Sequence, residues 1–144
     1  VSAVVLAPFL EEFAKAFPLF YRHGETERSI FTLGFLVGLG FGIFEFLVYV
    51  FVLEVPIAVR LPAIFFHGAS TSITAYGIAT RRTSWFYLIA VSLHFLNNVS
   101  AFSQITIDSS ALFGPWSIGT YLATAITYLL SCRLYQKTRE KIAY

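Results

Sequence analysis

Five long apolar stretches, separated by short polar segments, account for most of this 144-residue chain. A helix needs about 20 mostly apolar residues to cross the hydrocarbon core of a bilayer, because each residue adds about 1.5 Å. All five stretches have roughly this length, and turn-forming residues such as Gly, Pro and Asp lie between them. The pattern therefore predicts an all-α integral membrane protein, a bundle of about five transmembrane helices at residues 2–21, 29–53, 57–80, 84–103 and 111–132.

The composition supports a membrane environment. Hydrophobic residues make up 57% of the chain and charged residues only 12%, whereas soluble domains contain about 25% charged residues. The net charge of +2 is too small to indicate nucleic-acid binding. No linker or repeat divides the sequence, so we expect a single transmembrane domain over residues 1–144. Because the chain begins with Val1 and contains no Met, we expect further residues upstream.

Basic residues occur in alternate connections. Arg22 and Arg28 flank the first connection, Arg81 and Arg82 form the third, and the C-terminal tail is also basic. The second connection contains an acidic residue, and the fourth contains Asp108 with no basic residue. Cytoplasmic loops of membrane proteins are enriched in Lys and Arg. The distribution predicts five consecutive crossings with the N-terminus outside and the C-terminus in the cytoplasm.

Ionisable residues interrupt the first four apolar stretches. A charged side chain at the centre of a membrane helix costs about 2.5–3.5 kcal/mol, so an intramembrane ionisable residue indicates a functional site. At about 1.5 Å per residue, one such group in each stretch lies about 12–15 Å below the outer end. We therefore predict one buried active site between the first four helices. The interrupting residues are Glu11, Glu12 and Lys15, then Glu45, His67 and His94.

The spacing of these residues suggests how they interact. Lys15 follows Glu11 by four residues and Glu12 by three, so it can reach either carboxylate. Consecutive helical positions point about 100° apart, so we expect one glutamate to face the site and the other to face a neighbouring helix. His94 and Asn98 are four residues apart and point the same way. Such a pair combines a titratable group with a neutral donor that can stabilise an oxyanion.

The second stretch also carries three glycines at four-residue spacing, Gly34, Gly38 and Gly42. Small residues so placed let two helix backbones approach closely. Glu45 continues this stripe and is therefore expected to point into the bundle, as a supporting partner, a metal ligand or a proton carrier. Arg60, one heptad before the histidine of the third stretch, is placed to receive a substrate carboxylate or a lipid headgroup.

These motifs resemble those of a known family. The order Glu11-Glu12-x-x-Lys15, Gly40-Phe41-x-x-x-Glu45, His67, His94-x-x-x-Asn98 is similar to that of the PrsW family of intramembrane proteases. That family belongs to the wider group of CAAX prenyl endopeptidases and bacteriocin-processing enzymes. The resemblance implies a glutamate-dependent endopeptidase of the prokaryotic cytoplasmic membrane. Its substrate would be a membrane-anchored protein such as an anti-sigma factor.

The resemblance also implies roles for individual residues. Glu11 would activate a water molecule with the help of Glu12. His67 and His94 would orient that water and polarise the scissile carbonyl, and Asn98 would complete the oxyanion site. Lys15 and Glu45, which belong to the matched motifs, would be supporting residues, and Arg60 is a further supporting residue predicted from its spacing alone.

Three alternatives remain open. The favoured mechanism needs no cofactor, but Glu11, His67 and His94 are also an acceptable ligand set for zinc in a metal-dependent protease. Glu and His relays also occur in proton-coupled transporters, and a non-catalytic protein that binds membrane helices would use the glycine stripe. The expected partners are a membrane-anchored protein or peptide and the lipid bilayer, without nucleic acid. The substrate and the oligomeric state stay open.

Overall fold

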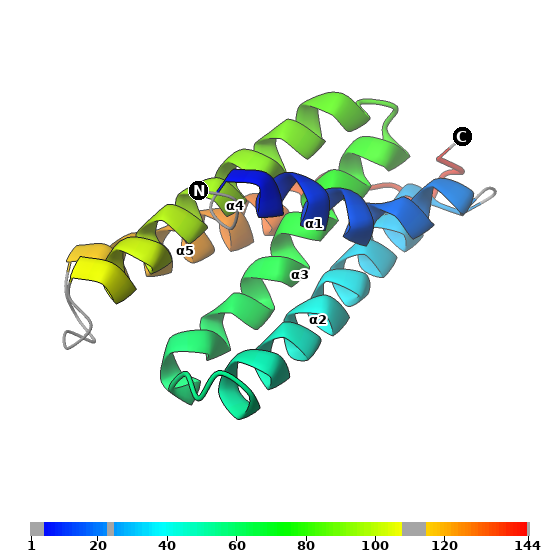
Figure 1. Cartoon of the computed structure of the whole chain (residues 1–144). Helices are drawn as coiled ribbons and strands as arrows, with labels where there is room; N and C mark the ends of the chain where they lie inside the picture. Colours follow the sequence, from blue (N-terminus) through cyan, green and yellow to red (C-terminus); the bar gives the residue numbers. More distant parts are fainter. Residues whose placement is uncertain (1–4, 23–24, 108–114, 144) are drawn as a thin grey trace.

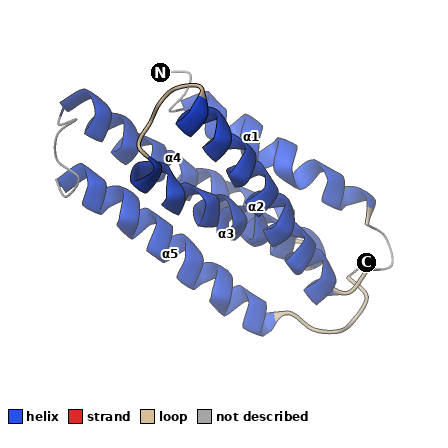
Figure 2. Ribbon diagram, turned by 90° about the horizontal axis from the view of Figure 1, so that it is seen from below, coloured by secondary structure: helices blue, strands red, loops and turns tan. Residues whose placement is uncertain are grey.

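The computed structural model describes residues 5–22, 25–107 and 115–143, and their regular secondary structure is helical (Figures 1 and 2). No strand occurs among these residues, apart from an isolated bridge between Thr26 and Ile142. The predicted all-α fold class is therefore confirmed. The helices are α1 Ala7–Ala16, η2 Phe17–Tyr21, α2 Glu27–Phe51, α3 Ile57–Ala79, α4 Thr83–Ile107 and α5 Pro115–Lys137.

The first predicted stretch is divided into two parts. The ten-residue α1 is followed directly by the five-residue 3-10 helix η2, which contains Pro18 near its start. Proline has no backbone N–H and clashes with the preceding turn, so an α-helix does not continue regularly through it. At about 1.5 Å per residue, α1 is about 15 Å long, half the thickness of a hydrocarbon core. It packs against α2, α3 and α4.

Two described helical segments, Glu27–Phe51 and Thr83–Ser103, are long and apolar enough to cross a membrane. Large apolar side chains are exposed on the outer faces of the bundle, among them Phe44, Trp85 and Leu129. Soluble monomers rarely expose broad apolar surfaces, whereas lipid tails accommodate them. These features agree with the predicted helical membrane protein.

The central helix is α3, which contacts α1, α2, α4 and α5. Its C-terminal half is almost completely buried, from Phe66 onward. The buried face includes polar side chains that bond to other helices. Ser70 Oγ donates to Glu12 of α1 at 2.9 Å, and Ser72 Oγ lies 2.7 Å from Ser131 Oγ of α5. These contacts explain why a helix with so many hydroxyl groups lies in the middle of the bundle.

The glycine stripe of α2 faces α3. A Cβ atom at Gly38 would collide with the backbone of His67 and lie 2.8 Å from the Cα of Gly68. A Cβ at Gly42 would lie 2.8 Å from the Cα of Ile64. The two backbones are therefore in direct contact, and the predicted packing role of these glycines is confirmed.

The chain beyond α5 folds back onto the start of α2. Thr26 caps α2, since its Oγ1 accepts a hydrogen bond from the N–H of Ser29 at 3.1 Å. Beside this cap, the N–H of Glu27 donates to the carbonyl of Lys141 at 3.0 Å, and the N–H of Ala143 donates to Glu25 at 3.0 Å. The C-terminal segment thus lies at the same end of the bundle as the turn between α3 and α4 (Figure 1).

Candidate functional site

Four helices bring their ionisable side chains together in one buried cluster. The imidazole rings of His67 and His94 lie at its centre, with their centroids 5.2 Å apart. The common depth predicted for these groups along separate helices therefore corresponds to actual proximity. The cluster consists of Glu11, Glu12 and Lys15 from α1, Glu45 from α2, His67 and Ser70 from α3, and His94 from α4.

Glu12 is the most enclosed carboxylate of the cluster, with no solvent-exposed surface. Its Oε1 accepts hydrogen bonds from Lys15 Nζ at 2.7 Å and from Ser70 Oγ at 2.9 Å. The same oxygen lies 2.9 Å from Nδ1 of His94. A buried charge is tolerated only when it is paired and hydrogen-bonded. Of the two glutamates, Glu12 therefore takes the lysine and fixes the position of the second histidine.

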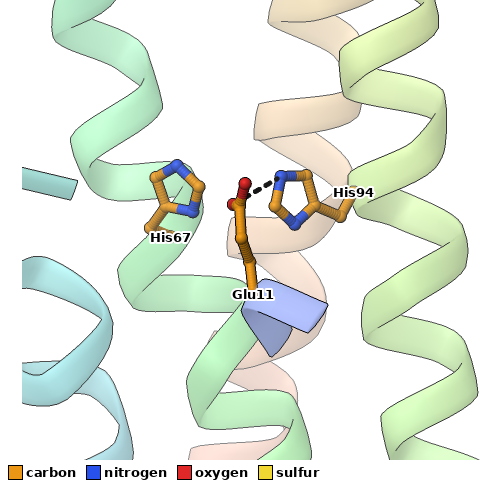
Figure 3. A group of neighbouring side chains, drawn as sticks. All are labelled: Glu11, His67 and His94. Atoms are coloured by element: carbon orange, nitrogen blue, oxygen red, sulfur yellow. Dashed lines mark ion pairs between the residues drawn. The ribbon is translucent and has the colours of Figure 1, made fainter. Parts of the chain in front are cut away.

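The contact with Glu12 defines the state of His94. A carboxylate only accepts, so in the neutral ring Nδ1 carries the hydrogen and Nε2 presents its lone pair. Nε2 lies 3.6 Å from Oε2 of Glu11, a buried oxygen without a hydrogen-bond partner in the described part of the chain (Figure 3). Two electron-rich atoms thus face each other, an arrangement that a proton or a metal cation between them would stabilise.

Both consecutive glutamates reach the cluster, which differs from the expectation that one of them faces a neighbouring helix. Glu12 contacts Nδ1 of His94 and Glu11 lies near Nε2 of the same ring. The imidazole has a nitrogen on each side, so it can meet two carboxylates that leave α1 in different directions. The Glu11 side chain is 26% exposed, so Glu11 is also the glutamate of the pair that solvent or substrate can approach.

His67 has a partner at each ring nitrogen. Nδ1 lies 3.0 Å from Nζ of Lys15, and Nε2 lies 2.8 Å from Oε2 of Glu45. A lysine ammonium only donates, so Nδ1 accepts and Nε2 donates to Glu45. The same Glu45 oxygen pairs with Nη2 of Arg60 at 2.8 Å, and the guanidinium lies 3.8 Å from the centre of the Tyr49 ring. Glu45 thus points into the bundle, and Arg60 is held beside it.

Glu11, His67 and His94 form a possible metal site. Each offers one ligand atom, and these atoms lie within 4.8 Å of one another (Figure 3). Elsewhere in the described ranges, no other group of three His, Cys, Asp or Glu side chains has this property. Zinc–ligand bonds of about 2.0–2.2 Å allow two ligand atoms on one ion to lie up to about 4 Å apart. The 3.6 Å between Glu11 Oε2 and His94 Nε2 meets this limit.

The surroundings of His94 also fit a metal ligand. Histidines that bind metals almost always donate their other N–H to a carboxylate or a carbonyl, as His94 does to Glu12. The donor set therefore fits a divalent cation at His94 and Glu11. At His67 one of the two existing partners, Lys15 or Glu45, must first move away.

The structure places the predicted Asn98 on α4, one helical turn beyond His94 and partly buried. Its neighbour Asn97 is more deeply buried, and the Asn97 Oδ1 has no hydrogen-bond partner within the described residues. Asn98 was predicted from its spacing to His94, and no role was predicted for Asn97. The hydrogen bond from Ser70 to Glu12 was not predicted either. The spacing of three residues from His67 was the available signal.

The chain was compared with models of protein families. The model described as PrsW family intramembrane metalloprotease covers residues 1–130, which include every residue of the cluster. Comparisons with curated proteins and with solved structures gave no match.

Proposed function

Because the chain belongs to the PrsW family of intramembrane metalloproteases, we propose that it cleaves a membrane-anchored protein at the cluster of Glu11, His67 and His94. One observation carries this proposal. A buried oxygen of Glu11 without a hydrogen-bond partner faces Nε2 of His94, while Glu12 holds the opposite nitrogen of that ring. Glu11 Oε2 and His94 Nε2 are therefore two basic atoms directed at the same space between them.

The other residues of the cluster keep these two bases in place. Lys15 neutralises Glu12 and is itself buried, so the charge required to hold His94 does not remain unpaired. Glu45 and Arg60 form a second ion pair, which holds His67 from the opposite side. Rigid positioning of reacting groups is one of the main ways in which enzymes lower a barrier.

We propose that Glu11, His67 and His94 hold a divalent metal ion such as zinc. When bound, such an ion activates a water molecule and polarises the scissile carbonyl. His67 can release one nitrogen without leaving a buried charge unpaired, because Lys15 keeps Glu12 and Glu45 keeps Arg60. Asn98, one turn from His94, is proposed as a donor to the oxyanion that forms when the carbonyl is attacked.

A metal-free glutamate mechanism is the second candidate. The observation that favours it is that both ring nitrogens of His67 already have partners. In this mechanism Glu11 takes a proton from water as general base, and the water attacks the carbonyl. Asn98 and His94, the latter with a second proton on Nε2, donate hydrogen bonds to the oxyanion, and Glu11 then passes its proton to the leaving amine. Glu12 keeps its structural role in both mechanisms.

We also propose that the protein lies in the prokaryotic cytoplasmic membrane with its C-terminus in the cytoplasm. Arg81 and Arg82 lie at the end of the bundle where the C-terminal segment meets α2. That segment is basic, and basic residues favour the cytoplasmic side. A membrane-anchored substrate would reach the cluster from within the bilayer.

The function can be tested with the purified protein in lipid and a panel of single-span peptides. Glu11→Gln removes a metal ligand in the first mechanism and the general base in the second. Loss of a general base alone should reduce cleavage by about 10²–10⁴-fold. Glu54→Gln removes an exposed carboxylate after α2 and should have no effect, so it is the matched control.

The same assay with a strong chelator separates the two mechanisms. Loss of cleavage that zinc restores supports the metal-dependent mechanism, and cleavage indifferent to the chelator supports the glutamate mechanism. A wild-type protein that cuts no peptide, but carries protons across the membrane in a Glu11-dependent manner, would contradict both.

A further inference from the structure

A cleft of about 800 Å³ lies at the end of the bundle where α3 turns into α4. Its walls are the last turns of α3, the turn itself and the segment around and after the end of α5. The proposed active site does not use this cleft. From His67 to Ala79, the last residue of α3, the helix rises about 18 Å, so the cleft and the cluster are well separated.

The cleft is strongly basic. Five basic side chains line it, and among the described residues that line it Glu27 is the one acidic residue. Glu27 pairs with the side chain of Lys141 at 3.1 Å and accepts a hydrogen bond from the backbone N–H of Arg139 at 3.1 Å. Within the described part of the chain, the side chains of the other four basic residues form no ion pair. Glu140 pairs instead with Arg28 outside the cleft, at 3.1 Å. A concave surface with this excess of positive charge attracts anions. The five basic residues are Arg81, Arg82, Lys137, Arg139 and Lys141.

Backbone contacts hold both walls of the cleft in place. On one side, the N–H of Arg82 donates to the carbonyl of Gly77 at 2.8 Å, and Arg81 adopts a left-handed conformation with φ of 59°. On the other side, the N–H of Arg28 donates to the carbonyl of Arg139 at 3.3 Å, and its Nη2 donates to the carbonyl of Thr138 at 3.2 Å. The basic side chains therefore start from fixed backbone positions.

The position of the cleft indicates what kind of anion it binds. Trp85, four residues after Arg81, is 73% exposed at the start of α4. Tryptophan is typical of the membrane–water interface. One turn further along α4, the apolar side chain of Leu88 is 49% exposed. The cleft thus lies at the border between a polar end of the bundle and an apolar outer face.

We propose that this cleft binds the phosphate headgroup of an anionic phospholipid, whose acyl chains lie along the exposed apolar face of α4. Basic pockets at the cytoplasmic side of membrane helices recognise such headgroups. A soluble anion would use only the basic residues, whereas a phospholipid also uses the apolar surface beside Trp85. The proposal does not depend on the cleavage reaction or on a metal.

The test measures lipid binding to the purified full chain in neutral detergent. The ligands are dioctanoyl phosphatidylglycerol, dioctanoyl phosphatidylcholine and inorganic phosphate. The cleft variant is Arg82→Gln/Arg139→Gln, and the control is Arg22→Gln/Arg133→Gln, which removes the same charge from exposed positions outside the cleft. Each lost basic residue should weaken binding about fivefold. We therefore expect the cleft variant to bind phosphatidylglycerol on the order of 25-fold more weakly, and the control to bind it like the wild type.

A single Lys137→Gln variant provides a milder change, with an expected loss of about fivefold, and the circular dichroism of each variant checks its helical fold. Equal phosphatidylglycerol affinities in the cleft and control variants would overturn the proposal. Equal binding of phosphatidylcholine and phosphatidylglycerol would also overturn it. If inorganic phosphate bound as tightly as phosphatidylglycerol and displaced it, the ligand would be a soluble anion. That result would contradict the proposed lipid.

Discussion

Replacement of Gly38 by alanine tests the contact that positions His67. A Cβ atom at Gly38 would collide with the His67 carbonyl and lie 2.8 Å from the Cα of Gly68. These are backbone atoms, so they cannot rotate away. Carbon atoms pack at about 3.5–4.0 Å, and α2 and α3 must therefore separate by about 1 Å.

The structure gives the size of the effect. Overpacking of this kind costs about 1–3 kcal/mol, and alanine in place of glycine in a helix returns about 0.5–1 kcal/mol. We expect Gly38→Ala to lower the free energy of unfolding by about 1 kcal/mol. The displacement of His67 should matter more, since a shift of about 1 Å in an active site can reduce the rate about 10²-fold.

Gly40 provides a matched control on the same helix. No atom lies within 4 Å of a Cβ added at Gly40, so Gly40→Ala should leave cleavage unchanged and stabilise the helix by about 0.5–1 kcal/mol. Both variants are compared by denaturant unfolding in micelles and by peptide cleavage. If Gly38→Ala behaves like Gly40→Ala in both assays, the close packing of α2 against the His67 backbone is refuted.

Three further substitutions test other contacts. Glu12→Gln removes the partner of a buried lysine and should destabilise the protein by about 3–5 kcal/mol. Glu11→Gln should destabilise it far less. If denaturant unfolding showed comparable losses of unfolding free energy for the two variants, the different roles assigned to the two glutamates would be contradicted. Ser131→Ala removes one hydrogen-bond partner of the buried Ser72 and should cost about 1 kcal/mol, so an unchanged melting temperature would argue against the α3–α5 contact. Thr26→Ala removes the cap of α2 and should also lower the free energy of unfolding by about 1 kcal/mol. Amide hydrogen exchange at the first turn of α2 should become faster. An unchanged exchange rate would show that the cap is not needed.

The long helices could be predicted closely because apolar stretches and turn-forming residues both define their ends. The glycine spacing also correctly indicated where α2 contacts another helix, since only small residues permit this approach. The division of the first stretch into α1 and η2 was not predicted. Hydrophobic pattern alone does not distinguish an α-helix from a 3-10 helix, although Pro18 was a signal for irregular structure.

The ionisable members of the cluster could be predicted because buried charges are costly and therefore conspicuous in an apolar helix. Which of these side chains pair with one another could not be predicted. Lys15 lies within reach of both Glu11 and Glu12 along the helix, and the choice of Glu12 depends on Ser70 of α3 and His94 of α4. These residues are 58 and 82 positions away in the chain. Such pairing is a property of the assembled bundle and not of the local spacing.

The most direct test of the proposed metal-dependent protease is the metal content of the purified chain. The protein is loaded with zinc, loosely bound metal is removed, and the remaining ion is measured by mass spectrometry for the wild type, Glu11→Gln, His94→Ala and the control Glu54→Gln. We predict a single bound ion per chain in the wild type and in Glu54→Gln, and little or none in the other two. A wild type without zinc, or equal zinc in all four proteins, would contradict a metal site formed by Glu11, His67 and His94.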